Sequence, residues 1–418
     1  MNKQLLFVEA NTTGTGMMAI RKARELGFEP VFLTERPERY NGLKELDCRI
    51  VLIDTNSEAA LIDWVTQESA QDRDIVGIMS TSDYYIESVA RLARHFGWIG
   101  NSRESIAACR NKVIFREKLD AHQVAQPRFL AIDSMEALME ARSSIPLPCI
   151  LKPADDSGSN HVRLCFRWDE VEQMTAEILA IKHNARGQAT ARTVLLEQYI
   201  EGPEFSVEMF SWQGQCFVIG ITEKRLTGYP YFVEAGHLFP ARLSVNVRQE
   251  IEQTVERALA AVNYRFGASH TEVKWTPEGC VVIESNARLA GGMIPELVRR
   301  STGIDLLQEQ IWCAAGKAPE WPQTVEYTNY AGIHFLVSDV LGTFVGINGI
   351  EAVSGIPGIA EVAITAQIGQ KVQPPQNFSH RLGYVIVEGN DYEETDKLIS
   401  QVHEFIKVQV NQHTGSGV

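Results

Sequence analysis

The sequence predicts an α/β protein that opens with a doubly wound parallel sheet and closes with a part rich in strands, and two observations carry this prediction. In residues 1 to about 110, short apolar runs alternate with amphipathic stretches, a βαβ rhythm that is typical of parallel sheets. We expect strands at 5–8, 30–33 and 75–80 and a helix at 17–26. From about 318 onward, several β-rich segments precede a predicted helix near 393–407.

The middle of the chain, between about 111 and 310, has a mixed pattern. Apolar runs at 149–152 and 193–198 predict two further strands. Residues 270–285 predict a β-hairpin around the turn at 276–279. Helices and strands that mix in this way indicate an α+β part between the two ends.

The composition limits the class of protein. With 418 residues, of which 44% are hydrophobic, the chain can bury a substantial core. Its length suggests about two to four domains or subdomains. The net charge of −14 argues against a nucleic-acid or anionic-membrane partner, because either would favour a clustered basic face.

The cysteines and the apolar runs indicate a cytoplasmic protein. The seven cysteines are odd in number and widely scattered, and no C-x-x-C pair occurs. We therefore expect reduced, structural thiols instead of disulfides or a Cys-rich zinc site. The first residues lack the apolar length of a secretory signal, and no apolar run approaches the length of a membrane span.

A glycine motif near the N-terminus leaves one alternative open. Gly14-x-Gly16-x-x-Ala19 follows a predicted strand and opens a predicted helix, and Glu35 lies near the end of the next strand. This matches the dinucleotide fingerprint in outline. The same spacing forms the tight strand-to-helix turn of any doubly wound sheet, so we favour the turn over NAD binding. The helix N-terminus remains a candidate site for an anion or a substrate carboxylate.

The strongest signal lies in the predicted hairpin. If the hairpin is centred on Glu278, then Glu272 and Glu284 lie directly opposite each other, and Asn286 and Arg288 share the face of Glu284. Two like charges paired across strands destabilise a sheet, so something positive must compensate. A divalent cation with oxygen ligands is one candidate. Lys274, on the same face, is the rival and would make a purely structural ion network.

Two lysines and a small loop suggest a phosphate site. Lys112 begins a predicted helix, and Lys152 ends the strand Pro-Cys-Ile-Leu-Lys-Pro. Lys152 is followed by a loop at 155–160 that contains Ser157, Gly158 and Ser159. The backbone N–H groups and hydroxyls of such a loop can close over a triphosphate. The alternative for either lysine is an ordinary surface position.

Two carboxylates lie near a predicted bend after the strand at 193–198. Glu197 and Ile200 precede the turn at Gly202, and Glu204 follows it. Carboxylates at such a bend could accept hydrogen bonds from an adenine amino group and ribose hydroxyls. Turn carboxylates are also commonly just solvated.

The order of these motifs resembles the ATP-grasp superfamily and, within it, the L-amino-acid ligases that make dipeptides, of the bacilysin-synthetase kind. The resemblance covers roughly residues 1 to 315. The run from Glu284 to Gly292 matches the family's Glu-x-Asn-x-Arg-x-x-Gly-Gly closely. The segment from Tyr231 to Pro240 is similar to a substrate-side segment of the family.

The resemblance implies a role for each candidate residue. Lys112, Lys152 and the loop residues Ser157, Gly158 and Ser159 would hold the ATP phosphates, Glu197 and Ile200 the adenine, and Glu204 the ribose. Glu272, Glu284 and Asn286 would bind Mg²⁺, with Mn²⁺ as the alternative metal. Arg288 would be the catalytic residue at the acyl phosphate, and Glu234, His237, Gly291 and Gly292 would contact the substrate.

The resemblance also implies the architecture. Residues 1–110 would form a Rossmann-like domain, and residues 111–315 an ATP-grasp domain. Its two subdomains, 111–195 and 196–315, would clamp the nucleotide. Residues 316–418 would form a C-terminal α/β domain that acts as a lid.

The reaction implied by the resemblance joins two L-amino acids through an acyl phosphate, with release of ADP and phosphate. Related ligases are commonly dimers, so a homodimer is expected. The alternatives are another ATP-grasp ligase or carboxylase with a different acceptor and a non-catalytic nucleotide-binding protein. No biotin attachment segment of the Ala-Met-Lys-Met kind occurs, which counts against a carboxylase.

Overall fold

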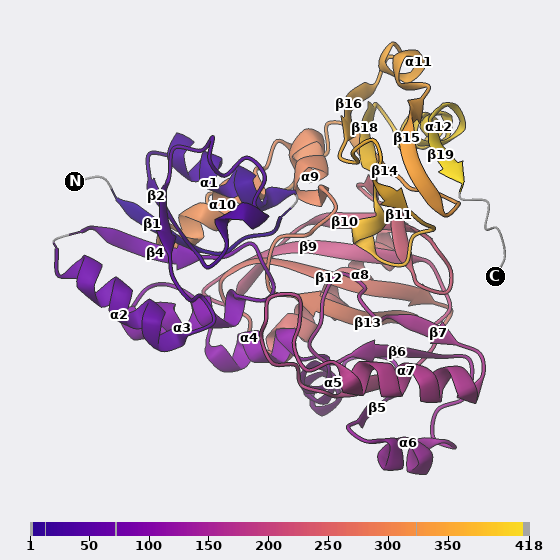
Figure 1. The fold of residues 1–418 in the computed structure, drawn as a ribbon, viewed down its shortest axis with the longest axis horizontal. Coiled ribbons are helices and arrows are strands. Elements are labelled where there is room, and N and C mark those ends of the chain that lie inside the picture. Colours follow the sequence, from indigo (N-terminus) through magenta and orange to yellow (C-terminus); the bar gives the residue numbers. More distant parts are fainter. Residues whose placement is uncertain (1–2, 13, 72, 323, 413–418) are drawn as a thin grey trace.

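The N-terminal part is a parallel sheet covered by helices on both faces, as the sequence predicts (Figure 1). A computed structural model describes residues 3–12, 14–71, 73–322 and 324–412. The sheet has the strand order β3-β2-β1-β4, and all its pairs are parallel. Its elements are β1 (Gln4–Val8), α1 (Thr15–Glu25), β2 (Glu29–Thr34), β3 (Arg49–Leu52), α2 (Glu58–Ser69), β4 (Ile75–Met79) and α3 (Ile86–Phe96).

The central strand β1 shows why helices cover both faces. All five of its residues are buried, and successive side chains point to opposite sides. Leu5 and Phe7 pack in one core with Ala19 of α1. Leu6 and Val8 pack in another, which includes Leu61 of α2 and Leu92 of α3. A continuous apolar run is therefore required here.

Two helices lead from this sheet to a small antiparallel sheet. They are α4 (Arg103–Arg110) and α5 (Lys112–Ala121), and the side chain of Asn111 accepts hydrogen bonds from the backbone N–H groups of Val113 and Ile114 at the start of α5. This cap makes the helix begin at Lys112. The sheet has the order β5-β8-β6-β7. Its elements are β5 (Phe129–Ile132), α6 (Met135–Ala141), β6 (Cys149–Pro153), β7 (Arg163–Cys165), α7 (Trp168–Ala180) and β8 (Val194–Gln198).

An eight-stranded antiparallel sheet forms the centre of the molecule, with the order β13-β12-β9-β10-β11-β14-β18-β16. Strands before and after residue 315 therefore share one sheet. Its strands are β9 (Glu204–Trp212), β10 (Gln215–Thr227), β11 (Val233–Phe239), β12 (Gly267–Thr276), β13 (Gly279–Asn286), β14 (Tyr330–Leu336), β16 (Ile359–Ile364) and β18 (Gly383–Gly389). The accompanying helices are α8 (Val245–Ala261), α9 (Ile294–Thr302), α10 (Leu306–Ala314) and α12 (Tyr392–Phe405).

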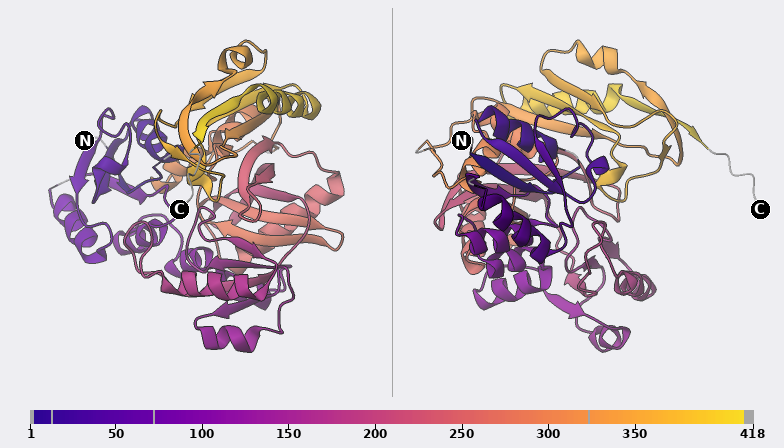
Figure 2. Two further views of the ribbon diagram at one scale, coloured as in Figure 1. Left: turned by 45° about the vertical axis from the view of Figure 1, so that its right-hand side comes forward. Right: turned by 60° about the vertical axis from the view of Figure 1, so that its left-hand side comes forward.

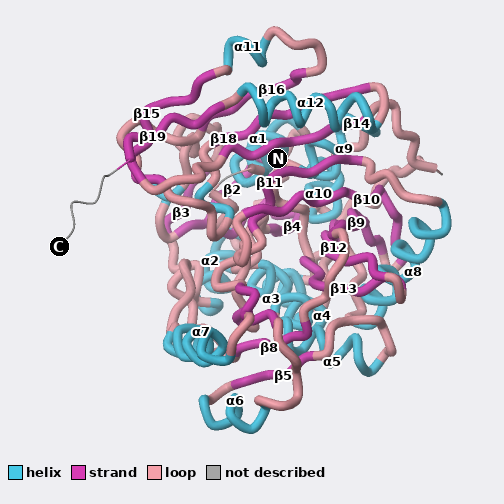
Figure 3. The backbone as a smooth tube through the Cα atoms, turned by 90° about the vertical axis from the view of Figure 1, so that its right-hand side faces the viewer, coloured by secondary structure: helices cyan, strands magenta, loops and turns pink. Residues whose placement is uncertain are grey.

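The C-terminal elements lie at one end of the molecule. They include a small sheet of order β17-β15-β19, made of β15 (Gly342–Asn348), β17 (Lys371–Val372) and β19 (Lys407–Gln412), and the short helix α11 (Ile350–Ser354). Figures 1 and 3 show α11 and α12 at the end opposite α6, with the large sheet between them. Both views of Figure 2 agree with this arrangement. Within the described ranges, no helix is long and apolar enough to cross a membrane.

Candidate functional site

One cavity of about 520 Å³ brings the predicted site residues together from the three larger sheets and their loops. His237 is the exception, because it does not line the cavity. The predicted residues that line it are Lys112, Lys152, Ser157, Gly158, Ser159, Glu197, Ile200, Glu204, Glu234, Glu272, Glu284, Asn286, Arg288, Gly291 and Gly292. The cavity also reaches the first sheet at Asn11 and Asp83.

The two carboxylates face each other as the sequence predicts, but the centre of the hairpin differs from the predicted one. Glu272 of β12 pairs with Glu284 of β13. Thr276 pairs with Gly279, so the hairpin is centred between Pro277 and Glu278 and not on Glu278. The register shifts by one residue after Glu272, which makes β13 bulge at Ile283 and restores the predicted pair.

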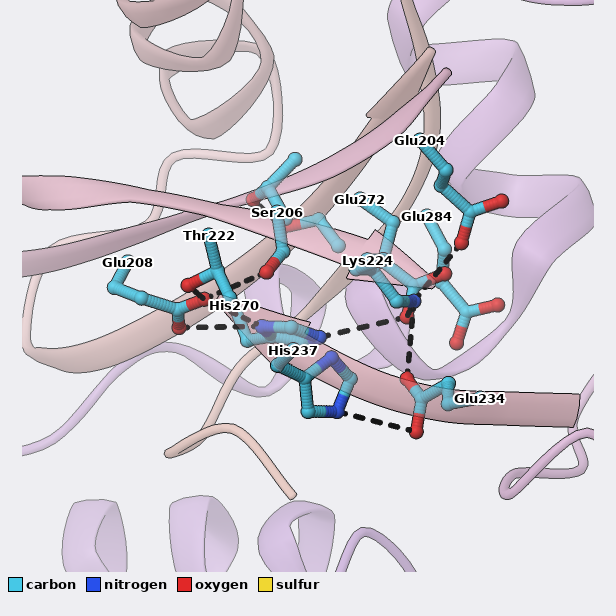
Figure 4. A network of polar contacts seen from close by, with 12 residues as sticks. Glu204, Ser206, Glu208, Thr222, Lys224, Glu234, His237, His270, Glu272 and Glu284 are labelled. Atoms are coloured by element: carbon cyan, nitrogen blue, oxygen red, sulfur yellow. Dashed lines mark hydrogen bonds and ion pairs between the residues drawn. The ribbon is translucent and has the colours of Figure 1, made fainter. Parts of the chain in front are cut away.

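The cation that compensates these charges is Lys224 of β10, which the sequence did not single out (Figure 4). Its Nζ lies 2.7 Å from Glu272, 2.9 Å from Glu204 and 3.1 Å from Glu234. Burial lowers the pKa of Lys224, but the three carboxylates outweigh burial and raise it well above its usual range. The predicted rival, Lys274, instead donates to the carbonyl oxygen of Ile200 at 3.1 Å.

A buried histidine supports Glu272 from the other side (Figure 4). His270 places Nδ1 3.1 Å from Oε1 of Glu208 and Nε2 3.4 Å from Oε1 of Glu272. Burial lowers the pKa of His270, yet the charge of Glu208 and the hydrogen bonds to both carboxylates raise it to about 9. Burial raises the pKa of Glu272, but Lys224 and His270 bring it well below its usual range. Glu272 is therefore held as a carboxylate.

The two predicted phosphate lysines are both buried at the cavity wall. Lys112 donates to the carbonyl oxygen of Asp156 at 2.6 Å and lies 3.5 Å from Glu284. Lys152 lies 2.7 Å from Oε2 of Glu197. Burial lowers the pKa of Lys152. Lys112 thus contacts the 155–160 loop, whereas Lys152 pairs with Glu197 at the end of β8, a partner that the sequence did not indicate.

Glu197 is committed to ion pairs on both of its oxygens. Besides Lys152, it accepts a hydrogen bond at 2.6 Å from Nε of Arg116, an arginine of α5 that the sequence analysis missed. Burial raises the pKa of Glu197, but Arg116 and Lys152 outweigh burial and lower it. Its carboxylate is thus held beneath the cavity, while the neighbouring Gln198, Tyr199 and Ile200 also line the cavity wall.

The loop with the small residues lies against a C-terminal segment. Gly158 has a φ of 74°, and a Cβ there would lie 2.2 Å from the ring of Phe378. The short 3₁₀ helix Phe378–His380 therefore packs directly on the loop. Only glycine fits at this position without displacing the ring.

Arg288 pairs with an aspartate of the first sheet. Its Nη2 lies 2.6 Å from Oδ2 of Asp83, in the loop after β4, and its Nη1 donates to the carbonyl oxygen of Leu289 at 2.7 Å. Oδ1 of Asp83 and Nε of Arg288 are buried without a hydrogen-bond partner in the described chain. Nothing in the sequence indicated a role for Asp83 beyond its place after an apolar strand.

Of the two residues predicted to contact the substrate, Glu234 lies at the cavity wall and His237 lies in the core behind it. Glu234 accepts from Nη2 of Arg381 at 2.6 Å. His237 is fully buried behind Gly292, where a Cβ would lie 2.6 Å from its Nε2. Burial lowers the pKa of His237 to about 3, so its 3.7 Å contact with Glu234 involves a neutral ring.

The donor set fits a magnesium ion that is shared with phosphates. Across the described ranges, no group of three or more His, Cys, Asp or Glu side chains could hold a metal on its own. Mg²⁺ is usually bound by one or two carboxylates together with substrate phosphates and water. Glu272 and Glu284 keep 21% and 22% of their side chains exposed, so both can reach a ligand in the cavity. Asn286 adds an amide oxygen on the same wall.

Two family models match the chain. Residues 145–296 match the ATP-grasp domain, and residues 334–411 match the L-amino acid ligase C-terminal domain 2. The second match covers the part of the chain for which the sequence analysis had no motif.

Relatives and a solved structure extend these matches. An uncharacterized protein of Sinorhizobium fredii is 31% identical over 97% of this chain and 83% of its own length. The L-arginine-specific L-amino acid ligase of Bacillus subtilis is 22% identical over 78% of this chain and 79% of its own. The crystal structure of an L-amino acid ligase from Bacillus licheniformis has a TM-score of 0.83 at 24% identity, covering 98% of this chain and 99% of that one, which shows a shared fold. The chain spans about a quarter of the length of the animal carnosine synthases that it also matches.

Proposed function

Because this chain belongs to the ATP-grasp superfamily of ligases and carries the C-terminal domain of the L-amino acid ligases, we propose that it joins two L-amino acids into a dipeptide. The reaction would proceed through an acyl phosphate and release ADP and phosphate. One observation carries the proposal: a single cavity contains the two buried lysines, the facing carboxylates, Arg288 and Glu234. Nucleotide and amino-acid chemistry can therefore meet in one place.

ATP and Mg²⁺ are the cofactors of ATP-grasp enzymes, and Mn²⁺ stays a proposal. We assign Lys112, Lys152 and the 155–160 loop to the ATP phosphates, Glu197 and Ile200 to the adenine, and Glu204 to the ribose. We assign Glu272, Glu284 and Asn286 to the metal, which when bound supplies charge neutralisation at the phosphates. The support for these assignments is that both carboxylates are partly exposed on the cavity wall and that Lys224 and His270 hold the pKa of Glu272 below its usual range.

Amide formation from a carboxylate fails in water because hydroxide is a poor leaving group. Transfer of the γ-phosphoryl group of ATP to the carboxylate oxygen makes phosphate the leaving group, after which an amine can attack. Phosphoryl transfer needs charge neutralisation, which Lys112 and Lys152 supply from the protein side. Arg288 lines the cavity and would stabilise the oxyanion of the tetrahedral intermediate.

The amino-acid end of the cavity would include Glu234, Gly291 and Gly292. We propose that Glu234 pairs with a substrate ammonium, a charge-assisted contact worth about 1.5–3 kcal/mol. His237 would not touch the substrate itself, because it lies buried behind Gly292, and would act through the residues in front of it. An unshielded acyl phosphate would hydrolyse, so the 155–160 loop should close before chemistry.

Two finer proposals concern the assembly. We propose a homodimer, on the resemblance to dimeric ligases. We also propose the division into residues 1–110, 111–315 and 316–418. The separate parallel sheet at the N-terminus supports the first boundary, and the family match at 334–411 supports a distinct C-terminal part, whose strands β14, β16 and β18 complete the large sheet.

The test is a matrix of paired L-amino acids incubated with ATP and Mg²⁺. We expect release of ADP and phosphate that depends on an amino acid, together with a dipeptide mass in the product spectrum. Formation of AMP and pyrophosphate, or turnover that no amino acid stimulates, would contradict the proposal.

A further inference from the structure

We propose that Arg116 is a positioning residue, which holds the bulge of β13 that brings Glu284 opposite Glu272. This inference rests on the proposed function, because it takes these two glutamates as the residues that hold Mg²⁺ with the nucleotide. Arg116 itself does not line the cavity. Its influence would pass through the backbone of β13.

Arg116 is one of the most completely buried side chains of the described chain, with 1% of its surface exposed. It lies on α5, four residues after Lys112, so the two side chains share one face of the helix. Its guanidinium makes three hydrogen bonds. Nε donates to Glu197 at 2.6 Å, Nη1 to the carbonyl oxygen of Val282 at 3.3 Å, and Nη2 to that of Ile283 at 2.6 Å.

The two carbonyl contacts coincide with the bulge. Val282 pairs with Val273 and Glu284 pairs with Glu272, so Ile283 is the extra residue. In a regular strand, successive carbonyls point to opposite sides. One guanidinium can donate to the carbonyl oxygens of two successive residues only where the strand is distorted, as it is at a bulge. Arg116 thus binds the feature that sets the direction of the next side chain, Glu284.

The position of β13 makes this contact necessary. β13 is an edge strand of the eight-stranded sheet, so its outer backbone groups have no strand partner. The N–H of Val282 donates to the carbonyl oxygen of Ala125 at 2.9 Å. The carbonyl oxygens of Val282 and Ile283 accept hydrogen bonds from Arg116. Without Arg116, the carbonyl oxygens of Val282 and Ile283 would lose this donor at the bulge.

The same side chain connects the bulge to the lysine end of the site. Glu197 accepts from Arg116 through Oε1 and pairs with Lys152 through Oε2. Lys112, one helical turn before Arg116, lies 3.5 Å from Glu284. Loss of the fork at Arg116 would therefore free Glu284 to shift relative to both Glu272 and Lys112.

Arginine and lysine differ at this position in a way that can be measured. A lysine keeps the positive charge beside Glu197 but lacks the planar fork that reaches two carbonyl oxygens as well. Arg116→Lys should thus retain the ion pair and release the bulge. Loss of support behind a metal ligand typically costs about 10- to 100-fold in metal affinity.

The experiment measures ADP binding to the full chain by calorimetry, with and without Mg²⁺. We expect Mg²⁺ to strengthen ADP binding to the wild-type protein and this enhancement to fall about tenfold or more in Arg116→Lys. Binding of ADP without Mg²⁺ should change much less. The matched control is Arg49→Lys, which alters a bidentate pair with Glu68 in the first sheet and should keep the full enhancement.

A second variant guards against misfolding. Arg116→Gln leaves Glu197 paired with Lys152 through Oε2, so no lone charge remains in the interior. It should lose the Mg²⁺ enhancement as Arg116→Lys does. The losses from Arg116→Lys and Glu284→Gln should also be less than additive, because both act on one carboxylate.

The outcomes separate this inference from the proposed function. Full Mg²⁺ enhancement in either Arg116 variant, strict additivity with Glu284→Gln, or an equal loss in Arg49→Lys would overturn the positioning role. A wild-type protein that binds no ADP, or binds it without any effect of Mg²⁺, would instead overturn the proposed function.

Discussion

Asp83 and Arg288 join the first sheet to the large sheet through one buried ion pair, with Nη2 of Arg288 2.6 Å from Oδ2 of Asp83. Burial opposes charge on Asp83, but Arg288 and the neighbouring cations lower its pKa, so the carboxylate stays ionised. The proposed catalytic arginine is therefore oriented by a residue from a different sheet.

Asp83→Asn tests this relationship. The amide keeps the shape of the side chain but removes the charge that fixes Arg288. We expect turnover to fall by about 10²-fold, with little change in the KM for ATP, because a misplaced catalytic group affects chemistry more than nucleotide binding. Steady-state kinetics provide the measurement. Asp47→Asn, which disrupts an exposed pair with Arg24, is the control, and equal effects from the two variants would remove Asp83 from the site.

Glu272→Gln and Glu284→Gln should both reduce turnover severely but should differ in stability. Glu272 is held by Lys224 and His270, which lower its pKa, so its loss removes favourable interactions. Among the described residues, the one ion pair of Glu284 is its 3.5 Å contact with Lys112. Its removal relieves repulsion across the strand pair. Without Mg²⁺, we expect Glu272→Gln to lower the melting temperature and Glu284→Gln to leave it unchanged or raise it. The reverse order would argue against this account of the charges.

The pair of facing glutamates shows how far the sequence reaches. Like charges at hairpin spacing could be recognised because the side-chain period of a strand is two. The bulge at Ile283 could not be recognised, because it depends on Arg116, which is distant along the chain. Lys224 was missed for a similar reason. In the sheet, β10 lies two strands from β12, with β9 between them, and this order brings the side chain of Lys224 to Glu272. Such a strand order cannot be read from local sequence patterns.

The C-terminal part illustrates the same limit. A parallel sheet could be predicted for the N-terminus because each βαβ unit is local in sequence. The strands β14, β18 and β16 join a sheet that begins at β9, and such distant pairing leaves no periodic signal. Arg381 therefore reaches Glu234 without any motif that could have indicated it. His237 was grouped with the substrate residues through the resemblance of the segment from Tyr231 to Pro240, and such a resemblance does not distinguish a cavity wall from the core behind it.

Acid should destabilise the protein partly through a histidine outside the site. Burial, together with the charges of His403 and Arg225, lowers the pKa of His334 from 6.5 to about 4. The unfolded chain then takes up the proton first, so this stability is present above pH 6.5 and is lost as pH falls toward 4.

His334→Gln should remove up to about 3 kcal/mol of this pH dependence. Urea unfolding at several pH values between 7.5 and 4 gives the measurement. The exposed His122→Gln variant is the control and should follow the wild-type profile. A His334→Gln profile as steep as that of the wild type would refute the assignment.

Lys224→Met decides whether the carboxylates around it form a structural ion network or a site that a metal can occupy. Lys224 Nζ lies within 3.1 Å of three carboxylates, so its loss leaves Glu204, Glu234 and Glu272 without their shared cation. Removing one partner of a buried charge network costs about 3–5 kcal/mol, and the melting temperature of the metal-free variant should fall accordingly.

A divalent cation beside Glu272 and Glu284 would replace part of the lost charge. Millimolar Mg²⁺ should therefore raise the melting temperature of Lys224→Met by more than that of the wild type. Lys274→Met is the matched control, because Lys274 is the neighbouring lysine with a backbone carbonyl as its main partner. If Mg²⁺ stabilises Lys224→Met no more than Lys274→Met, the carboxylates serve structure alone and the proposed metal residues are wrong.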